Sequence, residues 1–401
     1  MGAMTELLKS SYRPYELWAL VSMKISGQSR KTRNSEPLEL IAQNTDDRTF
    51  SYAALNQVSR SFALVIQELP AELKDPVCLF YLILRGLDTV EDDMDLNPNE
   101  KEKILSHFHE YIFDPEWKME GVGDTRDYQT LLKHFDKIIR FFLSIDEKYQ
   151  EVIADITKRM AYGMAHHGES KVETVTDYDR YCHYVAGLVG HGLSALFSAS
   201  GLEDADLKHQ LQIANSMGLF LQKTNIIRDY HEDLESGRLF WPREIWSLYA
   251  DEIDEFAQSP HANKSLDCLN HMVADALRHV DDCLDYMDKL KHPQVFRFCA
   301  IPQVMAIATL TEVFNNPKTF TQTVKIRKGM TARLIRKTSK AFWGRRILNR
   351  FNTLPHFHHR RFLRGYLSGY HPSVVSHLHH LFGDIIANLL SKSEPAAKGK
   401  G

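Results

Sequence analysis

The chain has 401 residues, of which 43% are hydrophobic and 25% charged, a composition that excludes a disordered or fibrous protein. Its net charge of −3 conceals an asymmetry, because residues 1–312 carry 32 Lys and Arg against 50 Asp and Glu, whereas residues 313–383 carry 14 Lys and Arg and no acid. The five cysteines are widely spaced and form no Cys-x-x-Cys pair, which predicts reduced core residues in a reducing compartment.

Helical periodicity runs through nearly the whole chain, without a convincing strand pattern or an internal repeat. A first periodic segment, residues 55–69, is closed by Pro70. Asp75 and Pro76 then predict a helix start, as N-cap and first helical residue, and the apolar residues 77–87 place that helix in the core. Further helices are predicted at residues 127–143, 147–167, 177–200, 208–234, 264–290 and 295–313. Mostly short connections favour one large helical domain.

Two groups of polar residues lie at the ends of apolar helical segments. Asp88, Glu91 and Asp92 are three and four residues apart, so they share one face of a helix. A second oxygen-rich stripe repeats this spacing much later in the chain, at Gln222, Asn225, Asp229 and Asp233.

Crowded carboxylates repel one another unless cations offset their charge. Magnesium suits this task because it prefers oxygen ligands and combines one or two carboxylates with substrate phosphates. The two groups therefore predict metal ions that hold a diphosphate from both sides. The alternative, two solvated acidic faces, is less favoured because both groups end apolar helices. Arg60, Arg85 and Arg228 are suited to phosphate binding, with ordinary ion pairs as their alternative.

Gly187, Gly190 and Gly192 stand in a helical segment, where each costs about 1 kcal/mol relative to alanine. Either two helices pack closely there, or the missing side chains leave room for a long apolar ligand.

Phe298 and Pro302 share a face of a later helix, which Pro302 should kink. The ring of Phe298 is either a core residue or a group that stabilises a passing cation. The glycine order does not fit a dinucleotide fingerprint, and the histidines of residues 356–380 lack the acidic or cysteine partners of a zinc site.

Several motifs in order resemble the squalene/phytoene synthase family, at residues 59–62, 87–93, 181–190, 225–233 and 237–242. The blocks 298–306 and 324–329 resemble eukaryotic squalene synthases (farnesyl-diphosphate farnesyltransferases) in particular. The resemblance implies an all-α isoprenoid-synthase helical bundle around a central apolar cavity. It also implies Mg²⁺, NADPH and a transferase reaction with a reductive second step. Two farnesyl diphosphates condense head to head to presqualene diphosphate, which is then reduced to squalene, the first step committed to sterol synthesis.

Carried over by position, the resemblance assigns roles to individual residues. The expected ligands of metal and diphosphate are Asp88, Glu91, Asp92, Asp229 and Asp233. The groups expected to hold diphosphate or the phosphates of NADPH are Arg60, Arg85, Arg228, Lys325 and Arg327. Tyr184 is expected nearest the proton lost in the first half-reaction. The residues expected to line the reaction cavity are Ser61, Phe62, Tyr81, Gln222, Asn225, Phe298 and Pro302.

The resemblance also divides the chain. Residues 1–34 form an N-terminal extension that begins like the scar of a tag, residues 35–330 the catalytic domain, residues 331–390 a basic, acid-free region of open structure, and residues 391–401 a disordered tail. Family members of this type end in a transmembrane anchor on the cytosolic face of the endoplasmic reticulum. No such stretch of ~20 apolar residues is visible here, so the chain as given is expected to be a soluble monomer without a nucleic-acid partner.

Other functions fit the residues less well. An enzyme of the same family could stop at presqualene diphosphate or make a phytoene- or dehydrosqualene-type product without NADPH, but the block with Lys325 and Arg327 argues against it. A head-to-tail prenyltransferase or terpene cyclase does not fit the segment 181–192. An inactive membrane scaffold would have lost its metal ligands, and every one is present.

Overall fold

A computed structural model describes residues 36–59, 62–167 and 172–341. Within these ranges every element is a helix and no β-strand occurs, which confirms the all-α prediction. The predicted extension 1–34 and the basic region beyond Ala341 lie outside the described residues, whereas α20 continues past residue 330. The first seven helices of the described residues are α3 (Leu38–Asn44), α4 (Asp47–Val58), α5 (Phe62–Gln67), α6 (Ala71–Asp92), α7 (Pro98–Tyr111), α8 (Arg126–Lys133) and α9 (Phe135–Leu143).

The remaining elements complete the bundle. The middle of the chain forms α10 (Glu147–His167), α11 (Val175–Cys182), the π-helical turn η1 (His183–Gly187), α12 (Leu188–Ser200), the 3₁₀ turn η2 (Ala205–His209), α13 (Leu211–Arg228) and α14 (Tyr230–Glu235). The last third forms α15 (Arg243–Trp246), α16 (Glu255–Gln258), α17 (Asn263–Leu277), α18 (Val280–Lys289), α19 (Pro293–Val313), the 3₁₀ turn η3 (Pro317–Phe320) and α20 (Lys328–Ala341).

The helix that ends in the first acidic group begins earlier than its sequence predicts. α6 begins at Ala71, so the predicted start at Asp75 and Pro76 is wrong, and Pro76 lies inside the helix. The Asp75 carboxylate does not cap α6. It accepts hydrogen bonds from Tyr52 Oη at 2.5 Å and Arg48 Nη2 at 3.0 Å. The local N-cap signal is overridden because this carboxylate ties α6 to α4 instead.

Three of the predicted long helices are interrupted. The predictions at residues 127–143, 208–234 and 264–290 each cover two helices, which are separated at His134, at Asp229 and at residues 278–279. Periodicity does not detect a break of one or two residues when apolar spacing resumes beyond it. The prediction at 177–200 holds, although η1 adds a π-helical turn to it, and those at 147–167 and 295–313 are confirmed to within two residues.

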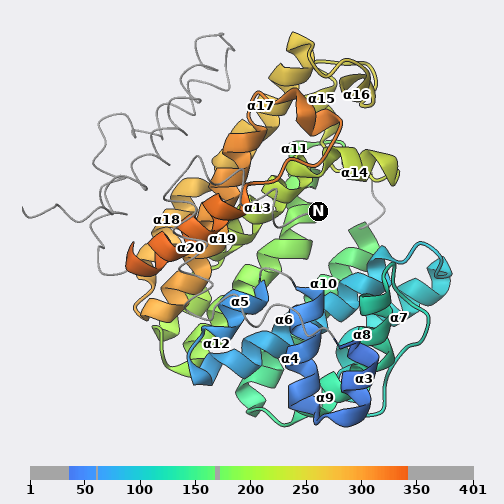
Figure 1. The fold of residues 1–401 in the computed structure, drawn as a ribbon, viewed down its shortest axis with the longest axis vertical. Helices are drawn as coiled ribbons and strands as arrows, with labels where there is room; N and C mark the ends of the chain where they lie inside the picture. Colours follow the sequence, from blue (N-terminus) through green and yellow to red (C-terminus); the bar gives the residue numbers. More distant parts are fainter. Residues whose placement is uncertain (1–35, 60–61, 168–171, 342–401) are drawn as a thin grey trace, which may run out of the picture.

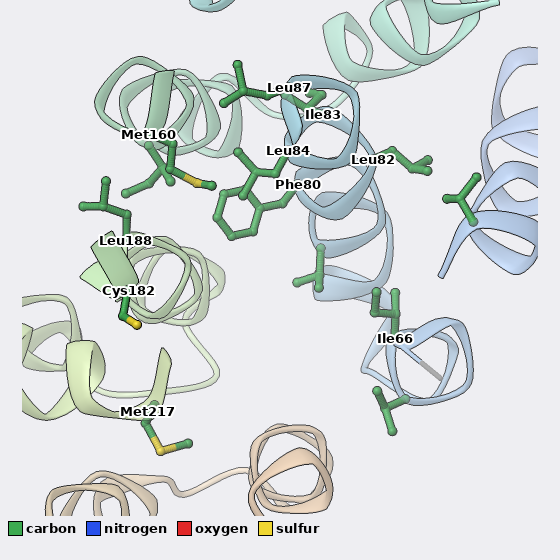
Figure 2. Close-up of a cluster of buried hydrophobic side chains, with 14 of the residues drawn as sticks. Ile66, Phe80, Leu82, Ile83, Leu84, Leu87, Met160, Cys182, Leu188 and Met217 are labelled. Atoms are coloured by element: carbon green, nitrogen blue, oxygen red, sulfur yellow. The ribbon is translucent and has the colours of Figure 1, made fainter. Parts of the chain in front are cut away.

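α13 is the central helix of the molecule (Figure 1). It packs against α11, α12, α17, α18 and α19, while α6 packs against α4, α9, α10 and α12. Figure 2 shows Phe80 and Leu84 of α6 directed toward Met160 of α10, with Leu82 on the opposite side of α6. One continuous core joins these helices, and all five cysteines are free and buried, as predicted.

α19 is long and apolar enough to cross a membrane, the one such helix among the described residues. However, 61% of its most apolar stretch of 18 residues is buried inside the protein. α19 packs against α5, α13, α18 and α20 and continues through Pro302 without ending. It is therefore a core helix of this fold.

Glycines allow η1 and α12 to approach α13 closely. A Cβ atom on Gly190 would lie 2.1 Å from the carbonyl oxygen of Ala214, and one on Gly218 would lie 2.2 Å from the carbonyl oxygen of Ala186. Backbone atoms cannot move aside as a flexible side chain can, so these positions exclude any larger residue. The structure confirms close helix packing, the first of the two explanations; Gly190 also borders an apolar cavity, so room for an apolar ligand stays a prediction.

Replacement of Gly218 by alanine should therefore destabilise the protein. Gly218→Ala is expected to lower the free energy of unfolding by about 1–3 kcal/mol, despite the better helix propensity of alanine, because the added methyl group forces α13 away from η1. Urea denaturation followed by circular dichroism measures this change. The exposed α13 variant Gln212→Ala serves as control, and equal stability of the two variants would contradict the close packing.

Candidate active site

A cavity of about 280 Å³ lies between α6, α10, α12, α13 and α19. Most of its lining is apolar, including Phe80, Leu84 and Met160, and polar residues enter it from α6, α13 and α19. The structure brings together at this cavity the predicted residues Phe62, Tyr81, Arg85, Asp88, Gln222, Asn225, Phe298 and Pro302. The two oxygen-rich helices α6 and α13 thus border one shared space, as their spacing in the sequence predicts.

The first acidic group lies at the end of α6. Burial raises the pKa of Asp88 to about 6; Arg85, whose Nη1 lies 3.6 Å from Asp88 Oδ2, opposes this rise and Asp92 adds to it. Burial also raises the pKa of Glu91 to about 7, and the charges of Asp92 and Asp88 raise it further. Burial and the neighbouring carboxylates therefore both disfavour the charged form of Asp88 and Glu91.

The second acidic group surrounds the break between α13 and α14. Asp229 ends α13 and accepts a hydrogen bond from Arg228 Nε at 2.7 Å. Burial raises the pKa of Asp233 to about 6, against the effect of Arg238, while Asp229 and Glu232 contribute to the rise. The interruption of the helix leaves Asp229 at a helix end, close to Asp233 and to the arginine that precedes it.

Arg238 connects the two acidic groups. Its Nη1 donates a hydrogen bond to Asp92 Oδ1 at 2.9 Å, and its Nη2 lies 3.9 Å from Asp233 Oδ1. Gly237, with φ of 72°, ends α14 and turns the chain so that the Arg238 N–H bonds the carbonyl of Asp233 at 2.9 Å. Sequence reasoning missed Arg238, although it lies in the motif 237–242. Gly237 is a typical helix stop signal, and it could have indicated that the chain turns there and brings the side chain of Arg238 toward the acidic groups.

A magnesium ion fits these residues only together with a ligand. Among the described residues, no group of three or more His, Cys, Asp or Glu side chains converges as a complete metal site. Mg²⁺ commonly takes one or two carboxylates and completes its shell with waters and substrate phosphates. Separate carboxylates with raised pKa values, linked between the two groups by Arg238, match an ion that binds with a diphosphate.

A second cavity, of about 750 Å³, borders the first acidic group from another side. Glu91, Asp92 and Arg238 line it, together with apolar residues such as Leu105 and Met164. Asp88 faces the first cavity, so the carboxylates of α6 lie between two spaces that each contain apolar surface.

Two tyrosines of the same motif lie in different surroundings. Tyr184 is part of η1, and its ring packs where a side chain on Gly163 would otherwise lie. Tyr181 stacks on Phe240 with ring centroids 4.7 Å apart and lines the second cavity. Burial raises the pKa of Tyr181 well above its usual value, and the carboxylates of the first acidic group, Glu91 foremost, raise it further. Sequence reasoning assigned no role to Tyr181, which lies one turn earlier and beside the carboxylates, while the role of Tyr184 stays a prediction.

The basic residues predicted for this site do not all lie near the two cavities. Arg85 lines the first cavity, and Arg228 contacts Asp229. Lys325 and Arg327 do not line either cavity and lie in the segment between η3 and α20, where Arg327 Nη1 is 3.4 Å from Glu312 Oε1. Arg60 and Ser61, also predicted for this site, lie outside the described residues.

Comparison with known proteins gives one consistent set of relatives. The model of the squalene/phytoene synthase family matches residues 55–330. Squalene synthase 1 of Arabidopsis thaliana is 52% identical over 292 residues, which cover 72% of this chain and 70% of the relative. Squalene synthase 10 of Panax ginseng is 48% identical over 342 residues, which cover 84% and 78%. The solved complex of TcSQS with the ligand E5700 has a TM-score of 0.75 and 45% sequence identity, and the match covers 86% of this chain and 98% of that one.

The acidic groups should bind magnesium and pyrophosphate together. We expect MgCl₂ plus inorganic pyrophosphate to raise the midpoint of thermal unfolding more than either alone, with a stabilisation of about 2.7 kcal/mol at a hundredfold excess over Kd. Asp229→Asn should lose this response while its circular dichroism stays helical, because one side of the site is removed. The exposed variant Asp206→Asn is the control. An undiminished thermal shift in Asp229→Asn would refute the assignment of that carboxylate.

Proposed function

This chain belongs to the squalene/phytoene synthase family, and from that membership we propose that its site joins two farnesyl diphosphates head to head and reduces the product to squalene. The enzyme is a farnesyl-diphosphate farnesyltransferase of sterol and isoprenoid synthesis. One observation carries the proposal: Arg85 and Asp88 of α6 line the same apolar cavity as the amides of α13, and Arg238 links Asp92 to Asp233.

The first chemical task is the departure of diphosphate from one farnesyl chain. Arg85 and Arg228, which lie beside the two acidic groups, stabilise the negative charge that develops on the departing oxygens. The carboxylates Asp88, Glu91, Asp92, Asp229 and Asp233 would hold Mg²⁺, which acts as a Lewis acid on those oxygens when bound. Asn225 and Gln222 present amide groups to the same space.

The second task is to keep the farnesyl cation from water. The walls formed by Phe80, Leu84 and Met160 exclude water from the cavity. Phe298 also lines it, and its ring is held by an edge contact with Phe197 at a centroid distance of 6.1 Å. Such a ring face stabilises a cation by about 0.5–2 kcal/mol. The cation then attacks the double bond of the second farnesyl chain.

The second farnesyl diphosphate needs a place of its own. The first cavity, at about 280 Å³, is near the lower limit of roughly 300–1,000 Å³ for ligand pockets. The second cavity provides additional space on the other side of Glu91 and Asp92. Tyr181 lies in that second cavity beside the carboxylates, where its neutral hydroxyl would relay the proton lost when presqualene diphosphate forms: its oxygen takes that proton while its own proton passes to the departed diphosphate.

The reductive step requires a hydride donor, and we assign Lys325 and Arg327 to the phosphates of NADPH, which supplies the hydride when bound. The product is a hydrocarbon made from a water-soluble diphosphate. An enzyme at a membrane surface can take the diphosphate from water and release the hydrocarbon into the lipid. This favours a location at the cytosolic face of the endoplasmic reticulum membrane, which the family resemblance also implies.

Product analysis tests this function directly. Purified protein incubated with farnesyl diphosphate and Mg²⁺ should release presqualene diphosphate, and addition of NADPH should convert the product to squalene. Removal of Mg²⁺ with EDTA should stop both reactions because the diphosphate then loses its bound cations. Gas chromatography with mass spectrometry identifies the products. A phytoene- or dehydrosqualene-type product whose yield does not depend on NADPH would overturn the proposal.

The two tyrosines can be separated by matched variants. Tyr181→Phe is expected to slow presqualene diphosphate formation by roughly 10²- to 10⁴-fold, the usual contribution of a proton-transferring side chain. Tyr184→Phe should have a much smaller effect, since its ring packs over Gly163. Single-turnover rates without NADPH measure this step alone. The opposite order of the two rates would restore the role to Tyr184.

A further inference from the structure

An aromatic cluster outside both cavities joins the second acidic group to the segment that precedes Lys325. Phe320 of η3 contacts Tyr230 edge-on with ring centroids 5.2 Å apart, Phe256 at 5.8 Å and Trp241 at 6.3 Å. All four side chains are buried. Tyr230 directly follows Asp229 in the sequence, and Trp241 lies three residues after Arg238. The chain beyond η3 therefore starts from a fixed point next to α14.

A hydrogen bond also joins the segment beyond η3 to α14. The hydroxyl of Thr323 donates a hydrogen bond to Oε1 of Glu232 on α14. Glu232 directly precedes Asp233 on α14, so this carboxylate lies beside the second acidic group. Because a chain advances at most about 3.6 Å per residue, the backbone of Lys325 lies within about 7 Å of that of Thr323.

The other end of the same segment is attached to α19. Arg327 Nη1 lies 3.4 Å from Glu312 Oε1, and Ile326 packs against the small apolar cluster of Ala308 and Leu334. Residues 321–327 are thus held between α14, with its acidic group, and α19, which carries Phe298. Lys325 lies between these two attachments with an exposed side chain.

We propose that the contact between Thr323 and Glu232 sets the position of residues 321–327 over the second acidic group, which makes Thr323 a positioning residue for the reductive half-reaction. The inference rests on the proposed function, in which Lys325 and Arg327 hold the phosphates of NADPH. Thr323 contributes no group to the first condensation.

The variant Thr323→Val removes the hydroxyl while keeping the shape of the side chain. Thr321→Val is the matched control, because the Thr321 hydroxyl bonds only the carbonyl of Lys318 in its own turn, at 3.4 Å. We expect Thr323→Val to raise the KM for NADPH roughly 3- to 10-fold, as loss of a hydrogen bond to a charged group would. The ratio of presqualene diphosphate to squalene should rise in parallel. The KM for farnesyl diphosphate and the condensation rate without NADPH should stay unchanged, and Thr323→Ser should restore the wild-type values.

Two measurements do not depend on turnover. NADPH fluorescence titration should give a Kd for Thr323→Val raised by the same factor, and hydrogen–deuterium exchange of residues 321–327 should be faster than in Thr321→Val. Equal Kd values, or equal exchange, in the two variants would overturn the positioning role. Failure of the wild-type protein to consume farnesyl diphosphate would instead refute the proposed function, while the exchange comparison still decides whether Thr323 fixes the segment.

Discussion

Mutual repulsion among partly buried carboxylates is the constraint on which this site depends. Asp88 and Glu91 on α6 and Asp233 on α14 all have raised pKa values, because burial disfavours their charge and neighbouring acids add to the effect. Arg238 lies between the two groups and offsets part of this repulsion. Such an arrangement is unfavourable by itself, and cations that arrive with a diphosphate would relieve it.

The fold places this unfavourable chemistry at the edge of a favourable core. α6 and α13 bury most of their surfaces, so their polar ends are held in position by apolar packing along the rest of each helix. Close approach at Gly190 and Gly218 fixes α13 against η1 and α12. The helix break at Asp229 and the turn at Gly237 then direct acidic and basic side chains back toward α6.

Much of the site follows from local sequence, because helical spacing determines which side chains share a face. Gln222 and Asn225 therefore share a face of α13, and the fold brings Asp88 of α6 to the same cavity. The missed features depend on contacts between distant segments. The Asp75–Pro76 signal fails because Asp75 bonds α4, and Arg238 acquires its role only when the segment after α14 reaches Asp92 at the end of α6. Tyr181 differs from Tyr184 in its tertiary neighbours and not in its motif.

The most direct measurement is a crystal structure of the protein with Mg²⁺ and farnesyl thiodiphosphate, a substrate analogue that ionises slowly. The account predicts metal-bound diphosphate between the carboxylates of Asp88 and Asp92 on one side and those of Asp229 and Asp233 on the other, with the farnesyl chain in the cavity lined by Phe80 and Phe298. A diphosphate bound away from either acidic group, or a farnesyl chain outside that cavity, would contradict it.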